Sequence, residues 1–352
     1  MFEKSTWIRL PRHVVVGHGV LDEAVEALDD LRLGDRPLVV TSPTPNEVAG
    51  GRLFESLADA GYEPTEVIID EASFSSVEAV EDAAAEADAD FLIGVGGGKA
   101  IDIAKMAGDR LDQAFVSVPT AASHDGIVSG RGSVPEGDSR HSVAAEPPVA
   151  VIADTVVLAD APWKLTTAGC ADIISNFTAV KDWRLAERLQ GVEYSEYAAA
   201  LSEMTAEMLI EGADSIRPGL EESAWVVVKA LVSSGVAMSI AGSSRPASGA
   251  EHLFSHQLDR LAPGAALHGH QVGVGSIMME YLHAGDGGRW RLIRDALATI
   301  GAPTTADGLG IDEDDVIEAL TTAHEIRDRY TILGSGMNES AAREVAERTD
   351  VI

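Results

Sequence analysis

The histidines are the residues whose spacing points most directly to chemistry. The chain contains ten, and four lie in two short segments: "GAEHLFSHQLDR" carries His252 and His256, and "LHGHQVG" carries His268 and His270. A spacing of four residues places His252 and His256 on one face of a helix. Neutral imidazoles held in this way, joined by a carboxylate, are typical ligands of zinc and related ions. The cluster therefore favours a metal site that combines His252 and His256 with His268 or His270.

A candidate for the carboxylate is Asp172, in the segment "GCADIISN". This stretch is apolar and has helical character, so a carboxylate without a partner would be costly there. Cys170, two residues earlier, is the only cysteine of the chain. A single cysteine excludes an internal disulfide framework and a zinc site built from thiolates. We expect Cys170 to be a small buried hydrophobic residue.

A second candidate site is the glycine-rich segment "GVGGGKAID", residues 94–102. It follows the apolar run "DFLIGV" and opens the amphipathic "KAIDIAKMAGDRL". It matches neither the dinucleotide fingerprint nor the P-loop, because Lys99 replaces the third glycine of the first and Ala100 replaces the Ser or Thr of the second. Backbone N–H groups at a helix N-terminus nevertheless bind anions, and ligands of parallel sheets bind at this end of the strands. The segment predicts a phosphate-binding loop, with a simple tight turn as the alternative.

The elements that must position these residues change character along the chain. Six apolar, β-rich runs are separated, early on, by amphipathic stretches such as residues 46–62. The runs are 13–17, 36–42, 65–70, 90–95, 114–119 and 148–154. Such runs joined by helices predict a parallel sheet covered on both faces. We therefore expect an α/β domain with a mainly parallel, Rossmann-like sheet over residues 1–160 and an all-helical domain over 161–352.

One connection does not fit this alternation. Residues 119–147 are too long for an ordinary link between elements and are rich in small polar side chains. Connections of this length inside a domain usually carry function or a hairpin.

The charge balance is strongly acidic. The chain has 57 acidic and 26 basic residues, a formal net charge of −31, and its acids are spread over helix-like segments. Self-repulsion of this size destabilises a compact protein in dilute buffer and is screened at multimolar salt. We interpret the composition as halophilic adaptation, and it argues against nucleic acid or an anionic membrane as a partner. No stretch reaches roughly 18 consecutive apolar residues, so we expect a cytoplasmic protein without stable membrane anchoring.

Five segments together resemble a known family. "GGGKAIDIAK", "PTAASHDGIVSG", "GCADIISN", "SGAEHLFSHQLD" and "ALHGHQVGVG" occur in the order and spacing of the sn-glycerol-1-phosphate dehydrogenases. That family is part of the superfamily of glycerol dehydrogenases, iron-type alcohol dehydrogenases and dehydroquinate synthases. The resemblance covers nearly the whole chain and implies a dehydroquinate-synthase-like fold. "PTAASHDG" is its most specific motif, since plain glycerol dehydrogenases continue differently after Pro-Thr.

The resemblance implies a role for each matching residue. The positions that match the NAD(P) pyrophosphate loop are Gly96, Gly97, Gly98, Lys99 and Ala100. Those that match the nicotinamide side are Thr120, Ala121, Ala122, Ser123 and Ser129. One zinc ion per subunit is implied at Asp172, His252 and His268, while Asp125, Asp172 and His256 are implied to contact the substrate as catalytic residues. The resemblance thus moves His256 from the metal to the substrate and leaves His270 behind the ligands.

The implied reaction is the NAD(P)H-dependent reduction of dihydroxyacetone phosphate to sn-glycerol 1-phosphate, a precursor of archaeal ether phospholipids. Three alternatives stay open. The first is a dehydrogenase of free glycerol or another small polyol, and the second is a dehydroquinate synthase, which "SHDG" and Asp172 disfavour. The third is a metal- and nucleotide-binding protein without turnover. We expect a homo-oligomer, and candidates for binding the substrate phosphate are Lys99, Arg131 and Arg140.

Overall fold

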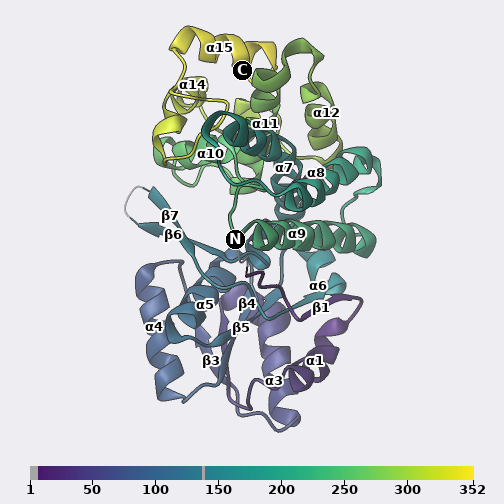
Figure 1. The fold of residues 1–352 in the computed structure, drawn as a ribbon. Coiled ribbons are helices and arrows are strands. Elements are labelled where there is room, and N and C mark those ends of the chain that lie inside the picture. Colours follow the sequence, from purple (N-terminus) through teal and green to yellow (C-terminus); the bar gives the residue numbers. More distant parts are fainter. Residues whose placement is uncertain (1–6, 137–138) are drawn as a thin grey trace.

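The computed structural model describes residues 7–136 and 139–352, with strands confined to its first half (Figure 1). Among the described residues, six parallel strands form one sheet in the order β1-β8-β5-β4-β2-β3. They are β1 (His13–Gly17), β2 (Pro37–Thr41), β3 (Thr65–Ile68), β4 (Phe91–Gly96), β5 (Ala114–Pro119) and β8 (Ala150–Asp154). Each lies within one of the six predicted runs or extends one residue beyond it, which confirms the parallel sheet.

The sheet is buried on both faces because its strands alternate their side chains between two layers of helices. In β2, Leu38 and Val40 belong to the core under α4 (Phe74–Glu86) and α5 (Gly98–Leu111). Val39 belongs to the opposite core with α1 (Ala24–Leu31) and α3 (Gly51–Asp59). Short helices complete this half: η1 (Val20–Glu23), α2 (Pro43–Pro45), η2 (Asn46–Gly50) and η3 (Asp125–Ile127).

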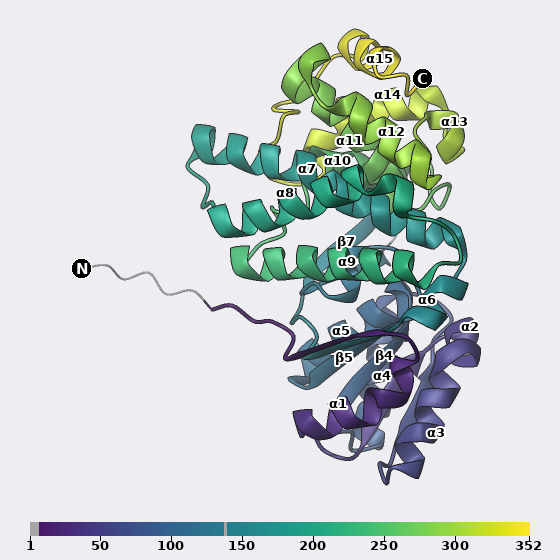
Figure 2. The same ribbon diagram turned by 90° about the vertical axis from the view of Figure 1, so that its right-hand side faces the viewer.

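The second half is helical, as expected from the sequence, and is drawn in teal to yellow in Figure 2. Its longer helices are α7 (Trp163–Gln190), α8 (Glu196–Glu211), α9 (Glu221–Ala241), α10 (Ala250–Leu261), α11 (His268–Ala284), α12 (Trp290–Ile300), α14 (Glu313–Thr322) and α15 (Glu339–Arg348). Shorter ones are α6 (Thr155–Asp160), η4 (Ala213–Ser215), η5 (Gly285–Gly287), α13 (Ala306–Leu309) and η6 (Ala323–Glu325). Helix α7 contacts α8, α9, α10, α11 and α12 and is buried on all sides along its middle. A helix surrounded in this way has no polar face.

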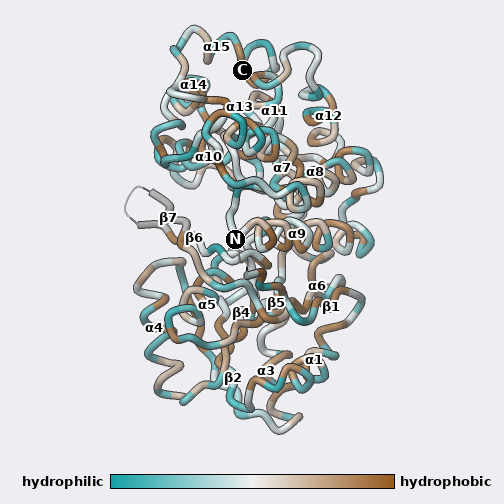
Figure 3. The backbone as a smooth tube through the Cα atoms, viewed as in Figure 1, coloured by the Kyte–Doolittle hydropathy of each residue, from teal (hydrophilic) through white to brown (hydrophobic). Residues whose placement is uncertain are grey.

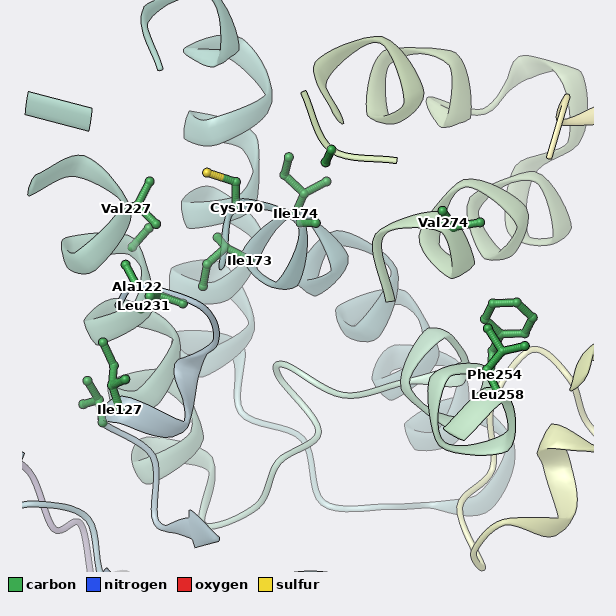
Figure 4. Close-up of a cluster of buried hydrophobic side chains, with 14 of the residues drawn as sticks. Ala122, Ile127, Cys170, Ile173, Ile174, Val227, Leu231, Phe254, Leu258 and Val274 are labelled. Atoms are coloured by element: carbon green, nitrogen blue, oxygen red, sulfur yellow. The ribbon is translucent and has the colours of Figure 1, made fainter. Parts of the chain in front are cut away.

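One hydrophobic core joins the two halves. It runs from the sheet face under α5 into the helices. Figure 4 shows Ala122 and Ile127, from the connection after β5, beside Val227 and Leu231 of α9. Cys170 lies in the same cluster, and burial raises the pKa of its thiol to about 12, so the expectation of a buried, unreactive cysteine is confirmed.

The long connection after β5 contains η3 and a hairpin. The hairpin is one of the two features expected for residues 119–147. The hairpin pairs β6 (Arg131–Glu136) with β7 (Ser139–Ala144) in antiparallel register and contacts α10 through β7. In Figure 1 it projects from the α/β half beside the gap between the two halves. The connection therefore belongs to both halves of the molecule.

Helix α9 is the most apolar of the long helices in the part of the chain that the structure describes. Among the described residues it is the one helix long and apolar enough, by length and composition, to cross a membrane. Half of its most apolar window is buried inside the fold. The tube of Figure 3 shows its apolar residues mixed with polar ones. The strong apolar character of α9 is explained by its packing against α6, α7 and α8.

Candidate active site

Three side chains from three helices meet where α7, α10 and α11 converge. Asp172 lies in α7, His252 in α10, and His268 is the first residue of α11. One ligand atom from each lies within 4.8 Å of the others, and Asp172 Oδ1 is 3.7 Å from His252 Nε2 and 3.9 Å from His268 Nε2. Two imidazoles and a carboxylate are a zinc-type donor set that leaves a coordination position for a substrate. These residues fit a metal ion.

His252 is oriented by the acid beside it in the sequence. Its Nδ1 is 3.0 Å from Glu251 Oε1, which also accepts the N–H of Gly249 at 2.5 Å. A histidine that donates one ring nitrogen to a carboxylate keeps the other available for a metal. Burial, with the nearby charges of Arg327 and Arg329, lowers the pKa of His252 to about 3, so the imidazole is neutral as ligation requires. Burial also raises the pKa of Glu251.

His268 is oriented by a chain of hydrogen bonds. Ser255 Oγ donates to Gln271 Oε1 at 2.6 Å, and Gln271 Nε2 donates to Asp259 Oδ1 at 3.2 Å. Because the Ser255 proton is used in this way, its oxygen accepts from His268 Nδ1 at 2.9 Å. The lone pair of His268 Nε2 is therefore directed to the cluster. The sequence interpretation missed Glu251 and Ser255, although both lie within three residues of His252 in the same helix.

The start of α10 is tied to α7 by a buried carboxylate. Asp182 Oδ2 accepts the N–H of Ala250 at 2.7 Å, and its Oδ1 accepts from Ile332 N at 2.6 Å and His283 Nε2 at 3.1 Å. A negative charge at a helix N-terminus is stabilised by the unpaired N–H groups and the helix dipole. This contact sets the position of the helix bearing His252 against the helix bearing Asp172.

Asp125 and His256 lie next to the three clustered ligands. The N–H of Asp125 donates to Asp172 Oδ2 at 2.9 Å, and Ser234 Oγ donates to Asp125 Oδ2 at 2.9 Å. Burial raises the pKa of Asp125 to about 6, and burial together with the neighbouring Asp125 raises that of Asp172. The His256 ring stacks on the His268 ring with centroids 5.7 Å apart. The spacing-based expectation that His252 and His256 share the metal is not what the structure shows, since His268 completes the cluster instead.

His270, which was expected behind the metal-binding residues, contacts Thr167 of α7. Its Nε2 is 2.8 Å from Thr167 Oγ1. The neighbouring Gly269 explains the geometry, because a Cβ there would overlap the backbone of Ala168. The close approach of α11 to α7 therefore turns His270 toward α7.

The three glycines between β4 and α5 serve different purposes. Gly96 has φ of +153°, a conformation that favours glycine. A Cβ on Gly98 would overlap the ring of His124, which accepts the N–H of Gly126 at 3.0 Å. Gly97 is the N-cap residue of α5 and provides no side-chain cap, and a Cβ there would meet open space. Gly97 therefore marks the open helix N-terminus that a phosphate group would fill.

The other predicted cofactor residues lie in α5 or in the connection after β5. Lys99 Nζ donates to Asp70 O at 2.6 Å, Ala100 is buried, and the N–H of Thr120 donates to Gly96 O at 2.9 Å. Ala121, Ala122 and Ser129 are buried. The segment that follows β5 thus runs beside the glycine turn.

A cavity of about 490 Å³ brings the two sites together. Its wall includes Gly98, Lys99, Ser123 and Ser129 from the α/β half. It also includes Asp125, His252, His256 and His268. The volume is in the range of cofactor and small-molecule pockets. A nucleotide at the glycine turn and a small substrate at the histidines would therefore share one chamber.

Comparison with known proteins places the chain. A family model described as iron-containing alcohol dehydrogenase matches residues 15–162. A glycerol-1-phosphate dehydrogenase [NAD(P)+] of Haloarcula marismortui is 74% identical over 352 residues, covering 100% of both chains. This chain belongs to the glycerol-1-phosphate dehydrogenase family. The resemblance noted from the sequence motifs is confirmed.

Other members of the glycerol-1-phosphate dehydrogenase family and solved structures agree. The Halobacterium salinarum protein of the same name is 72% identical over 100% of both chains. The halophilic sources of these relatives agree with the acidic composition. A glycerol dehydrogenase structure from Schizosaccharomyces pombe superposes with a TM-score of 0.83 at 20% identity, covering 99% of this chain and 91% of that one. At this identity the likeness shows the fold alone, which confirms the predicted fold class.

Proposed function

We propose that this chain reduces dihydroxyacetone phosphate to sn-glycerol 1-phosphate with NADH or NADPH. One observation carries the proposal: His252 and His268 of the metal cluster line the same cavity as the glycine turn at the N-terminus of α5. A metal site and a dinucleotide site in one chamber are suited to metal-assisted hydride transfer to a carbonyl. The relatives' name, glycerol-1-phosphate dehydrogenase, supports this choice of substrate.

In this proposal each residue has a defined task. Asp172, His252 and His268 hold a zinc ion, which when bound supplies a Lewis acid for the C2 carbonyl, while NAD(P)H supplies the hydride. Glu251 and Ser255 keep both imidazoles in the tautomer that turns Nε2 to the metal. Asp125 orients Asp172 through its N–H and contacts the substrate. His256, stacked on His268 at the cavity wall, delivers the proton to the C2 oxygen.

The cofactor is held by the residues around the glycine turn. We propose that the N–H groups of Gly97, Gly98 and Lys99 bind the pyrophosphate, with Gly96 and Ala100 shaping the turn. The nicotinamide side is assigned to the segment after β5, namely Thr120, Ala121, Ala122, Ser123 and Ser129. The division into a cofactor domain, 1–160, and a metal and substrate domain, 161–352, is part of the proposal. So are a homo-oligomer, a cytoplasmic location and the absence of membrane anchoring.

The test is steady-state oxidation of NADH and NADPH in molar KCl with dihydroxyacetone phosphate or free dihydroxyacetone, together with the metal content of the same sample. We expect turnover of the phosphorylated ketone and one zinc per chain. Turnover of the free ketone alone would instead identify a glycerol or small-polyol dehydrogenase. Bound metal and nucleotide without turnover of either ketone would identify a binding protein.

A substitution separates the two sites. In His252→Ala we expect turnover to be lost while NAD(P)H affinity, measured by fluorescence titration, is retained, because the glycine turn lies outside the metal cluster. The matched control is His18→Ala, whose exposed ring contacts Glu221. Loss of nucleotide affinity in His252→Ala alone would contradict the separation of the sites.

A further inference from the structure

The cavity wall beside the metal cluster carries two arginines. Arg131 begins β6, and Arg327 follows η6. Both side chains line the same cavity as His252 and His268, so the arginines approach the metal cluster from two separate segments. Burial and, second to it, the charge of Arg131 lower the pKa of Arg327. The charge of Arg327 in turn contributes to the lowered pKa of His252. The guanidinium groups and the metal ligands therefore lie within electrostatic reach of one another.

Arg327 differs from its neighbour Arg329 in what it contacts. Arg329 donates to Ser244 Oγ at 2.8 Å and to Ser248 O, which ties down the segment between α9 and α10. The Arg327 side chain, among the described residues, forms no hydrogen bond or ion pair and instead lines the cavity. Half-buried charges are usually paired, and this chain has 57 acids with which to pair 26 bases. An arginine left facing a cavity in such a chain indicates that its partner is a ligand.

The positive charge around Arg327 is larger than one group. Burial and the charges of Arg327, Arg245 and Arg131 together lower the pKa of Arg329 to about 9. Guanidinium groups that lie near one another repel, and a dianion bound between the two that line the cavity, Arg131 and Arg327, removes that cost. The planar fork of arginine also matches the oxygens of a phosphate monoester in a bidentate arrangement.

We propose that Arg327, with Arg131 beside it on the cavity wall, binds the phosphate of the substrate and makes the enzyme selective for a phosphorylated over a free three-carbon ketone. This inference rests on the proposed function. The oxygen to be reduced then lies at the histidine cluster, while the phosphate lies against the arginines. Of the candidates taken from the sequence, Lys99 is engaged with Asp70 O at the glycine turn. Arg140 lies in β7, where the side chain is outside the described residues.

The same phosphate chemistry occurs in the cofactor, so the test must separate the two sources. The variants are Arg327→Met, Arg327→Lys and Arg131→Met. The control is Arg245→Met, whose guanidinium is also partly buried but does not line the cavity. For each, KM and kcat are measured in molar KCl with dihydroxyacetone phosphate, free dihydroxyacetone, NADH and NADPH. The thermal midpoint is recorded with and without inorganic phosphate.

We expect Arg327→Met to raise the KM for dihydroxyacetone phosphate roughly 10–100-fold, the value of one charge-assisted bidentate contact. The kinetic constants for free dihydroxyacetone and both cofactors should not change. Arg131→Met should raise the same KM. Arg327→Lys should lie between Arg327→Met and the unmodified enzyme, because it keeps the charge but loses the fork. Inorganic phosphate should raise the thermal midpoint of the unmodified enzyme and of Arg245→Met, but much less that of Arg327→Met.

Several results would overturn the inference. An unchanged KM for dihydroxyacetone phosphate in a folded Arg327→Met enzyme would do so, as would an equal loss with both ketones, which indicates a structural role. A rise confined to NADPH would assign the arginine to the cofactor's 2′-phosphate instead. If Arg327→Met does not fold, Arg327→Lys and Arg131→Met decide by the same criteria. Absence of turnover in the unmodified enzyme would contradict the proposed function, while the shift with inorganic phosphate still decides the arginine site.

Discussion

Ser255 offers the sharpest test of how the site is held together. It is fully buried in α10, accepts from His268 Nδ1 at 2.9 Å and donates to Gln271 Oε1 at 2.6 Å. Ser255→Ala removes both contacts but leaves the proposed metal-binding residues Asp172, His252 and His268 in place. Loss of a partner that orients a ligating histidine typically weakens metal binding about 10–100-fold, which corresponds to about 1.4–2.7 kcal/mol. The buried Gln271 oxygen left without its donor would cost about 1–3 kcal/mol in stability.

The assay is a zinc titration of the metal-free protein against a competing chromophoric chelator in molar KCl. Turnover is followed over the same zinc range. We expect a higher Kd for zinc in Ser255→Ala, with most of kcat recovered at saturating zinc. The control is Ser276→Ala, which is equally buried in α11 but donates only to Val272 O within its own helix. A zinc Kd in Ser255→Ala equal to that of the control, or a loss of turnover that zinc does not restore, would refute the role assigned to the hydrogen-bond chain.

Three further predictions concern the frame around the site. Lys105 donates to Asp102 Oδ1 and to two carbonyls of the connection after β5, and Lys105→Met should cost about 3–5 kcal/mol of unfolding free energy because it leaves a buried carboxylate without its cation. Urea denaturation beside the exposed control Lys229→Met measures this, and equal stabilities would contradict it. Gly97→Ala should keep the thermal midpoint but raise the KM for NAD(P)H. Gly98→Ala should lower the midpoint as well, since only its Cβ meets a neighbouring ring. Identical behaviour of the two variants would count against phosphate binding at Gly97. Dilution from about 3 M to about 0.1 M KCl should lower the thermal midpoint because screening of the net charge of −31 is lost, and a midpoint independent of salt would exclude halophilic stabilisation.

The parallel sheet and its order of elements were accessible from the sequence. The central strands are buried on both faces, so their residues form unbroken apolar runs such as "PLVV" in β2. The glycine turn was accessible for a similar reason, because a glycine-rich break between a strand and a helix is a local feature. The different structural roles of Gly96, Gly97 and Gly98 were not accessible from the sequence. That the ring of His124 lies against Gly98 depends on a contact between segments 26 residues apart.

The metal cluster marks the limit of what periodicity can predict. A spacing of four residues correctly placed His252 and His256 on neighbouring turns of one helix. Spacing alone does not decide which of the two contacts the metal. The rotation of α11 against α7 and α10 decided that His268 meets His252 and Asp172 while His270 turns to Thr167.

By itself, the sequence determined the class of fold, the glycine turn, the residue types of a metal site and, through its motifs, the family. Only the tertiary structure decided which histidines meet, which carboxylates and hydroxyls orient them, and that Arg327 faces the cavity. The physical reason is that a local pattern records which side of an element is apolar. The partners of a buried polar group come from other helices, and their positions depend on how the whole core packs.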